Sequence, residues 1–162
     1  MNKYVFVLGN NYKLSIVEIL NYFYNNNLKV EKLIFTKQIL VIDIEKNINC
    51  QDIIDIFGGT IKIGKLISEE NNIDEKIFEN IILENSNKNK RINFGFNNYI
   101  LKDKFNYKIK NLGLTIKNNL KNIGNRARLV MDNNIDILSS VTSKKNNLLK
   151  ENGFEFLVTK LN

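Results

Sequence analysis

The chain has 162 residues, which is enough for one ordinary domain or two small domains that share an interface. Hydrophobic residues make up 43 % of it and charged residues 25 %, near the averages of folded proteins, so its many asparagines and lysines do not indicate disorder. The formal net charge is +7, and with no histidine and a single cysteine the composition argues against zinc sites, internal disulfides and Cys/His nucleophiles.

The first part of the chain predicts a strand, a helix and a hairpin. Residues 3–9 have the pattern of a buried strand, and in the helix that follows, Ser15 and Glu18 have the S-x-x-E spacing of a capping box. The apolar stripe of this helix, wide enough to cover a sheet, consists of Val17, Leu20 and Tyr24, flanked by Ile16 and Phe23. Two strands at 30–36 and 38–45, joined by a tight polar turn, predict a hairpin.

A short amphipathic segment and a further strand complete this region. Residues 50–57 form the segment, which Gly58 and Gly59 can end by adopting a left-handed backbone conformation, and residues 60–67 form the strand. The order strand, helix, strand, strand, helix, strand is that of the ferredoxin-like split βαβ arrangement, in which two helices cover one face of a sheet. We therefore expect a ferredoxin-like N-terminal domain over residues 1–70.

A polar stretch at 68–76 is the expected domain boundary, because charges and asparagines replace the apolar run there. A helix and a strand at 92–96 follow. The clearest periodicity of the chain then predicts a helix that Gly124 ends. Its apolar positions are Ile109, Leu112, Ile116, Leu120 and Ile123. Gly113 within this helix costs about 1 kcal/mol relative to alanine, which indicates either a closely packed backbone or a tolerated loss.

The last part predicts a strand, a helix and a closing strand. Residues 126–131 form the first strand and residues 154–161 the last. Between them, Ser139 fits the N-cap of a helix that extends to Leu149. The side that this helix buries consists of Leu138, Val141, the Lys145 stem, Leu148 and Leu149. The second half thus again mixes helices and strands around one small sheet.

Motifs for catalysis are missing from the sequence. It holds neither a Walker loop nor a G-x-G-x-x-G fingerprint, so no cofactor is expected in this chain. Cys50 lies at the start of a short helix, where the helix dipole can lower a thiol pKa, but an unpaired cysteine without a basic neighbour in sequence more often packs or caps. The loop GNNYKLS at residues 9–15 lacks the arginine with which small phosphatases of ferredoxin-like shape hold an acyl phosphate. We predict no catalytic residues and no metal site.

Neither a secretory signal nor a membrane span is evident. The run YVFVLG at residues 4–9 is too short for the apolar region of a signal and ends in a polar turn. No stretch approaches the length of a membrane span. Together with the single cysteine, these features predict a cytoplasmic protein without a membrane partner.

Positive charge is concentrated in the second half of the chain. Residues 1–82 have a net charge of −2 and residues 83–162 a net charge of +9. Such a surface gains binding free energy from nucleic-acid phosphates by displacing counterions, although a solvated cationic surface without a partner has the same composition. The candidate RNA-binding residues, which could form one surface, are Lys110, Lys117, Lys121, Arg126, Arg128, Lys144, Asn146 and Asn147.

Aromatic residues interleaved with these cations have two roles open to them. They can stack an unpaired base, or they can fill the core of a small mixed domain, which is the commoner role. These residues are Phe94, Phe96, Tyr99, Phe105 and Tyr107.

Three segments of the chain together resemble a known family. The segments VLGNNYKLSIVEI, FGGTIKIGKLI and LSSVTSKKNNLL followed by FEFLV are similar to the N-terminal half of tRNA guanosine-10 N2-methyltransferases of the archaeal and Trm-eleven type. In that family a ferredoxin-like domain precedes a THUMP domain, and a Rossmann-like methylase follows. The likeness spans nearly the whole chain and is most specific at residues 138–149.

The resemblance implies that residues 74–162 form a THUMP domain, which in the family grips the acceptor stem and 3′ end of tRNA. The positions that it carries over as RNA-facing are Lys144, Lys145 and Asn146. At Ser143 and Asn147 the chain departs from the family pattern of a hydrophobic residue and a further lysine, so this helix is expected to pack and bind less strongly.

The catalytic half of the family is not represented in this sequence. That half needs a glycine-bearing loop for S-adenosylmethionine and an (N/D)-P-P-Y motif, and the chain contains no proline. We therefore expect a two-domain α+β tRNA-binding module that does not methylate alone and works with a methylase domain, in cis within a longer protein or in trans. One alternative is a protein-interaction module whose basic face binds an acidic partner subunit. Another is a small stand-alone RNA-modifying enzyme, which requires cofactor uptake.

Overall fold

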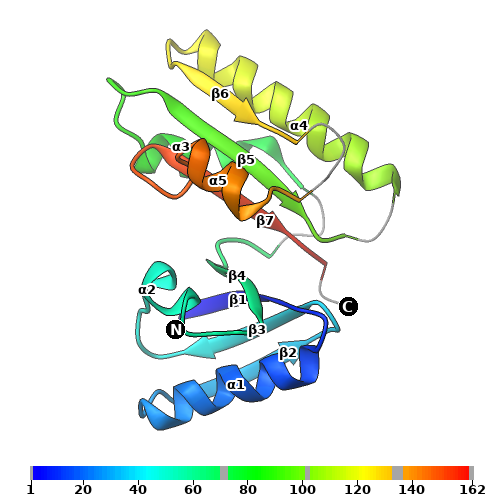
Figure 1. Ribbon diagram of the computed structural model, residues 1–162. Coiled ribbons are helices and arrows are strands. Elements are labelled where there is room, and N and C mark those ends of the chain that lie inside the picture. The colour runs from blue at the N-terminus through cyan, green and yellow to red at the C-terminus, as the bar shows by residue number, and fades with distance from the viewer. Residues whose placement is uncertain (1, 70–72, 101–102, 133–136, 161–162) are drawn as a thin grey trace. The chain divides into compact units, whose positions relative to one another are not determined.

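The computed structural model describes residues 2–69, 73–100, 103–132 and 137–160, and of residues 103–107 only the backbone (Figure 1). These residues fall into two compact units, the first ending at residue 69 and the second at residue 160. Each unit has its own sheet and its own hydrophobic core. The chain is of the α+β class, as the sequence predicts.

The first unit contains a four-stranded sheet and two helices. Its elements are β1 (Asn2–Leu8), α1 (Tyr12–Asn25), β2 (Val30–Phe35), β3 (Ile39–Ile44), α2 (Cys50–Ile54) and β4 (Thr60–Lys65). Neighbouring strands are antiparallel in the order β2-β3-β1-β4, and β2 and β3 form the predicted hairpin. The order of elements along the chain is the one expected of a split βαβ arrangement.

Alternate residues of β1 and β3 build the core of the first unit. Phe6 is fully buried there, and Phe23 of α1 packs against it edge to face, with ring centroids 6.1 Å apart. The predicted stripe of α1 is rotated, however, because Val17 and Tyr24 are 53 % and 82 % exposed while Ile19 is fully buried. The predicted flanking residues Ile16 and Phe23 pack on the core, so the predicted side is confirmed only in part.

The start of α1 also differs from the prediction. Its N-cap is Asn11, whose side-chain oxygen accepts a hydrogen bond from a backbone N–H of the first turn. The Ser15 hydroxyl instead donates to the carbonyl of Gly59 at 2.8 Å, and the Glu18 carboxylate accepts from the N–H groups of Gly58 and Gly59 at 2.8 and 3.0 Å. The predicted capping box is therefore wrong, because both of its side chains bind the turn that precedes β4.

Gly58 and Gly59 do not end a helix. Helix α2 stops at Ile54, before the two glycines, and among the described glycines the one with a positive φ is Gly124. A Cβ atom at Gly59 would collide with Ser15. The second glycine is thus required by close packing against α1.

The second unit contains a three-stranded sheet and three helices. Its elements are α3 (Glu75–Asn85), β5 (Ile92–Asn98), α4 (Asp103–Asn122), β6 (Ala127–Val130), α5 (Ser140–Lys145) and β7 (Gly153–Val158). The strands are parallel in the order β6-β5-β7. Helix α4 connects β5 to β6, and α5 connects β6 to β7, as the crossovers of a parallel sheet require.

Different helices cover the two faces of this sheet. Phe94 and Phe96 of β5 belong to a core that also contains residues of α3 and α4. Gly95 between them faces the other way, since a Cβ atom added there would meet Leu138 and Leu148, which flank α5. Because strand side chains alternate between faces, α4 and α5 lie on opposite faces of the sheet.

The periodicity predicted for α4 is largely confirmed. Its first four apolar positions lie in the core of the second unit, whereas Ile123 lies beyond the last turn and is 61 % exposed. Gly124 has a φ of +87°. Its N–H and that of Asn125 donate to the carbonyls of Lys121 and Leu120, which is the Schellman pattern. Gly124 therefore ends the helix, as predicted.

Helix α5 is shorter than the sequence predicts. Ser139 is its N-cap, as predicted, and accepts a backbone hydrogen bond of 3.0 Å. The helix ends at Lys145, because Asn147 adopts a φ of +56° that a right-handed helix cannot contain. Leu138 and Leu148 are buried, as predicted, but Val141 and Leu149 are 74 % and 44 % exposed, so the predicted buried side is confirmed only in part.

The aromatic residues among the cations have mixed positions. Phe94 and Phe96 are buried in the core, which confirms the structural role for these two. Tyr99 is half-buried, and burial raises the pKa of its hydroxyl well above the ordinary value. The side chains of Phe105 and Tyr107 lie outside the described part of the chain.

Candidate nucleic-acid interface

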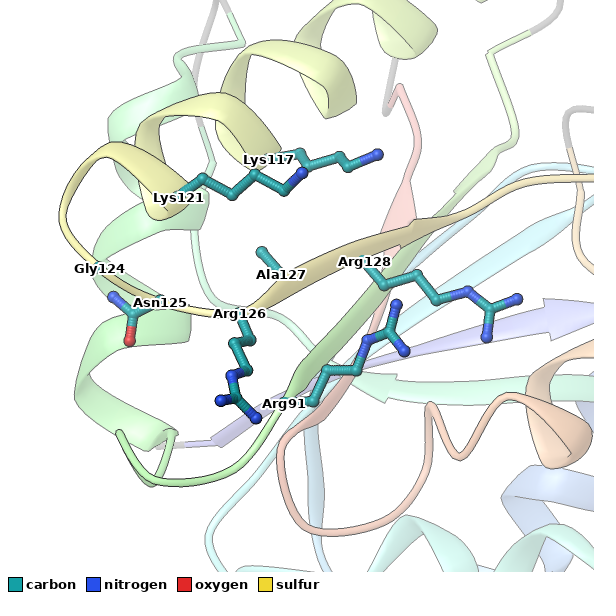
Figure 2. Close-up of a pocket in the computed structure, with 8 residues that line it drawn as sticks. All are labelled: Arg91, Lys117, Lys121, Gly124, Asn125, Arg126, Ala127 and Arg128. Atoms are coloured by element: carbon teal, nitrogen blue, oxygen red, sulfur yellow. The ribbon is translucent and has the colours of Figure 1, made fainter.

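A hollow lined by positive charge lies beside β6, and we call it the β6 hollow. Its volume is about 590 Å³. Its lining, drawn in Figure 2, consists of Arg91, Lys117, Lys121, Gly124, Asn125, Arg126, Ala127 and Arg128. Five of these residues are cations and none is a carboxylate. The local potential therefore favours an anion.

Three arginines reach the hollow from β6 and from the residues directly before β5 and β6. Strand β6 lies at one end of the sheet order, so one of its edges has no strand partner in the described structure. Arg126 and Arg128 are two residues apart and share a face. The register that pairs Ile92 with Ala127 places Arg91 beside Arg126. Figure 2 shows all three guanidinium groups on the same side of the β6 ribbon.

Two lysines reach the hollow from α4. Lys117 and Lys121 are four residues apart and therefore lie on the same side of this helix. Helix α4 packs closely on β6, because Gly113 of the helix faces the side chain of Leu129 of the strand. In Figure 2 the two lysine side chains extend in the same direction, on the other side of β6 from the arginines.

The open edge of β6 adds a backbone donor. The carbonyl of Arg126 accepts a hydrogen bond of 2.8 Å from the N–H of Ile92, so the backbone groups of Arg126 point toward β5. Backbone groups alternate between the two edges of a strand, and those of Ala127 therefore point to the open edge. Within the described chain, this N–H has no hydrogen-bond partner.

The charges of the hollow are not neutralised by nearby carboxylates. Over the residues that the structure describes, none of the five cations is within ion-pair distance of an acidic group. A salt bridge of this unit joins Lys90 to Glu151 at 2.6 Å, and neither residue lines the hollow. The five cations are thus accessible to an anionic partner.

Four of the predicted RNA-binding residues meet in this hollow, namely Lys117, Lys121, Arg126 and Arg128. Lys110 lies on α4 but does not line it. Arg91 was missed by sequence reasoning, because its place in the hollow depends on the pairing of β5 with β6, which no local pattern reveals. Its position directly before a predicted strand was the one signal that could have found it.

The remaining predicted RNA-binding residues lie elsewhere, on and just after α5. Lys144 and Lys145 are exposed, and Asn147 is exposed in the turn that follows the helix. Asn146 is half-buried, and its side-chain amide donates to the carbonyl of Thr142 at 2.9 Å. Since α5 covers the face of the sheet opposite to α4, these residues are not part of the β6 hollow.

A second hollow, of about 540 Å³, lies in the first unit. Its lining consists of Gly9, Asn10, Asn11, Leu14, Ser15, Glu18, Gly58, Gly59, Thr60 and Ile61. The set contains no cation and one carboxylate, that of Glu18, which already accepts two backbone hydrogen bonds. This hollow therefore does not suit a phosphate or another anion.

Cys50 is half-buried, and burial raises the pKa of its thiol, which disfavours the reactive thiolate. Across the described chain, no three histidine, cysteine or acidic side chains gather as metal ligands would. None of the helices in the described ranges has both the length and the apolar character needed to cross a membrane.

Comparison with known proteins gives a likeness in fold. No protein-family model matches the sequence, and no curated protein matches it either. The structure is similar to the crystal structure of PH1313 from Pyrococcus horikoshii Ot3, with a TM-score of 0.55 and 9 % sequence identity over 84 % of this chain and 48 % of that one. This chain thus spans about half the length of PH1313. At this identity the likeness concerns the fold alone.

Proposed function

We propose that this chain is an RNA-binding module, in which the second unit is a THUMP-type domain that holds tRNA for a tRNA guanine-N2 methyltransferase. The observation that carries the proposal is the β6 hollow, where five cations face one space without a carboxylate. Lysine and arginine in such a group gain binding free energy from phosphates by releasing counterions. The exposed Lys144 and Lys145 of α5 add positive charge to the same unit.

In this proposal the chain positions the substrate and does not react with it. The second unit holds the acceptor stem and 3′ end of the tRNA, and the first unit fixes the spacing to a methylase domain located in cis or in trans. Positioning of this kind supplies a large part of many rate accelerations. The methylase domain is needed because an (N/D)-P-P-Y motif requires proline and this sequence has none.

The rival function is a basic surface that binds an acidic protein subunit. Protein interfaces are enriched in aromatic residues, methionine and arginine at their centres and depleted in lysine and alanine, whereas the β6 hollow combines its arginines with two lysines, has Ala127 as its one apolar side chain and contains neither an aromatic residue nor methionine. Its composition is closer to that of a phosphate-binding surface, in which arginine, lysine and asparagine side chains contact the backbone. The lining thus favours nucleic acid over a protein partner.

The test is the affinity for deacylated tRNA, measured by filter binding over a range of salt concentrations. We expect binding that weakens steeply with salt and a K144A/K145A variant whose log-log salt slope is smaller by about one unit for each phosphate that the variant no longer neutralises. A K37A/K46A variant, which removes two exposed lysines of the first unit, is the charge-matched control and should bind as the unaltered protein does. Failure to bind tRNA, or binding of an acidic protein that tRNA does not displace, would refute the proposal.

A second measurement tests whether the chain itself binds a methyl donor. Isothermal titration of the chain with S-adenosylmethionine should give no binding heat, because no cofactor loop is present in the sequence. A saturable signal would favour the rival view that the chain is itself a small RNA-modifying enzyme.

A further inference from the structure

We propose that the β6 hollow is a clamp for the sugar-phosphate backbone of one RNA strand, which it holds through consecutive phosphates without contacting the bases. This inference rests on the proposed RNA-binding function and names the part of the RNA that this hollow recognises. It also enlarges the interface by Arg91, which lies in the same lining as the four predicted cations.

The cations of the hollow form two rows. The lysine row consists of Lys117 and Lys121 on α4, and the arginine row consists of Arg126 and Arg128 with Arg91 beside them. Figure 2 shows the rows on opposite sides of the β6 ribbon. A strand of nucleic acid lying along the open edge of β6 would have positive charge on both of its sides.

The two rows have nearly the same period. Lys117 and Lys121 are four helical residues apart, which is about 6 Å along α4. Arg126 and Arg128 are two strand residues apart, which is about 6.6 Å along β6. Consecutive phosphates of one nucleic-acid strand are separated by a similar distance. Each row can therefore neutralise neighbouring phosphates of one nucleic-acid strand. An isolated anion, or a polyphosphate whose charges are closer together, would not need cations at this spacing.

The floor between the rows is the open edge of the strand. The N–H of Ala127 points to this edge and has no partner in the described structure. A backbone N–H that faces a space lined by cations is a good donor to a phosphate oxygen. A phosphate at this position would receive one hydrogen bond from the backbone and charge-assisted hydrogen bonds from both rows.

No aromatic side chain, the usual platform for a stacked base, lines the hollow. The nearby Phe94 and Phe96 are buried in the core of the unit, so they cannot stack a base there. Arginine and asparagine contact bases in other complexes, but two rows of cations at the spacing of phosphates favour recognition by charge and spacing, so affinity should depend little on the base sequence.

The experiment measures the binding of a fluorescent single-stranded RNA of roughly ten nucleotides. It uses the full chain with the lysine row changed by K117Q/K121Q or the arginine row by R126Q/R128Q. Each double variant should lower the log-log salt slope by about 1.4, since each neutralised phosphate of a single strand contributes about 0.7. The matched control, K108Q/K150Q, removes two exposed lysines of the same unit outside the hollow and should leave the slope unchanged. Thermal unfolding monitored by circular dichroism verifies that all variants are folded.

Further arms test the mode of recognition. Scrambling the RNA sequence should change the affinity less than about threefold, and a change above tenfold would overturn recognition by the backbone alone. A duplex RNA of the same length shows whether the bound strand belongs to a stem or to an unpaired end. If the row variants lower the salt slope with duplex RNA, the strand belongs to a stem. If they lower it with single-stranded RNA alone, the strand is an unpaired end. Both results support the clamp.

The clamp can fail separately from the proposed function. If both row variants bind RNA like the unaltered protein while K144A/K145A binds more weakly, the clamp is refuted and the RNA-binding function stands. If the unaltered protein binds no RNA, both are refuted.

Discussion

The hydroxyl of Ser15 donates a hydrogen bond of 2.8 Å to the carbonyl oxygen of Gly59, which attaches α1 to the turn before β4. The two residues are so close that a Cβ atom at position 59 would overlap the Ser15 side chain and lie 3.2 Å from its Cα. The Gly59→Ala variant should therefore be less stable by about 2 kcal/mol, the usual cost of overpacking. Urea unfolding measured by circular dichroism tests this.

Gly58 is the matched control, because it is exposed and a Cβ atom there would meet a single oxygen of Glu18 at 3.6 Å. The free energy of unfolding of the Gly58→Ala variant should lie within about 0.5 kcal/mol of the original value. Equal losses of stability for the two glycine variants would contradict the proposed role of the packing against Ser15.

The same hydrogen bond marks a limit of what the sequence could predict. The S-x-x-E spacing of Ser15 and Glu18 fits a capping box whether or not a turn from elsewhere in the chain is close by. The helix itself was predicted correctly, since apolar periodicity is a local property. The partners of both side chains lie some 40 residues away in sequence, so local spacing could not identify them.

Gly113 should respond to substitution in opposite directions in two backgrounds. A Cβ atom there would lie 2.9 Å from both terminal methyl carbons of Leu129, so Gly113→Ala should cost stability, by about 1 kcal/mol after the gain in helix propensity is subtracted. In an L129A background the methyl groups are gone, and the same change should stabilise by about 1 kcal/mol. A double-mutant cycle in urea measures the coupling, and additive effects would contradict the close packing of these two residues.

The helices of the second unit explain which predictions succeed. In α4 a long stripe of apolar residues faces one core, so periodicity located both the helix and its buried side. In α5 the buried residues Leu138, Ser143 and Leu148 come from the loop before, the helix and the turn after it. They are five residues apart, which does not match the three- or four-residue spacing of a helical stripe. The predicted helix ends early because Asn147 has a positive φ, and a positive φ at asparagine is not visible in a hydrophobic pattern.

The candidate site was predicted in part for a related reason. Lys117 and Lys121 share a side of α4, and Arg126, directly before β6, shares a side with Arg128 of that strand, so the sequence spacing of each pair predicts that its two members lie together. The meeting of the two pairs depends on how α4 packs on β6, and the addition of Arg91 depends on the register of β5 with β6. Both are tertiary relationships, which a charge pattern alone does not contain.

Asn97 is expected to be a large contributor to the stability of the second unit. It is fully buried, its side-chain oxygen accepts from the N–H of Leu138 at 2.8 Å, and its amide donates to Glu155 at 2.8 Å. Asn97→Ala would leave the buried N–H of Leu138 without an acceptor, at a cost of about 2 kcal/mol in stability. Asn93, on the same face of β5, is the matched control, because its side-chain oxygen is already buried without a partner. Asn93→Ala should cost less than Asn97→Ala in the same denaturation assay, and the reverse order would contradict this role.

The last prediction concerns Cys50 and alkaline pH. Burial raises the pKa of this thiol above the ordinary value of 9.0, outweighing the backbone hydrogen bond and the charge of Lys65, which lower it. The folded state therefore prefers the neutral thiol, so this contribution to stability is complete below pH 9 and is lost as the pH rises through the folded-state pKa. The urea midpoint should fall more between pH 8 and pH 10.5 for the unaltered protein than for a C50A variant, in which the group is missing.

Alkylation gives an independent measure of the same pKa. At pH 8 iodoacetamide should modify Cys50 more slowly in the folded protein than in protein unfolded with urea, since the thiolate is the reacting form and burial disfavours it. The informative quantity is how the alkylation rate changes with pH. Limited access of iodoacetamide to Cys50 would by itself slow the reaction by the same factor at every pH. A folded-to-unfolded rate ratio that rises with pH supports the raised pKa, and a constant ratio would contradict it.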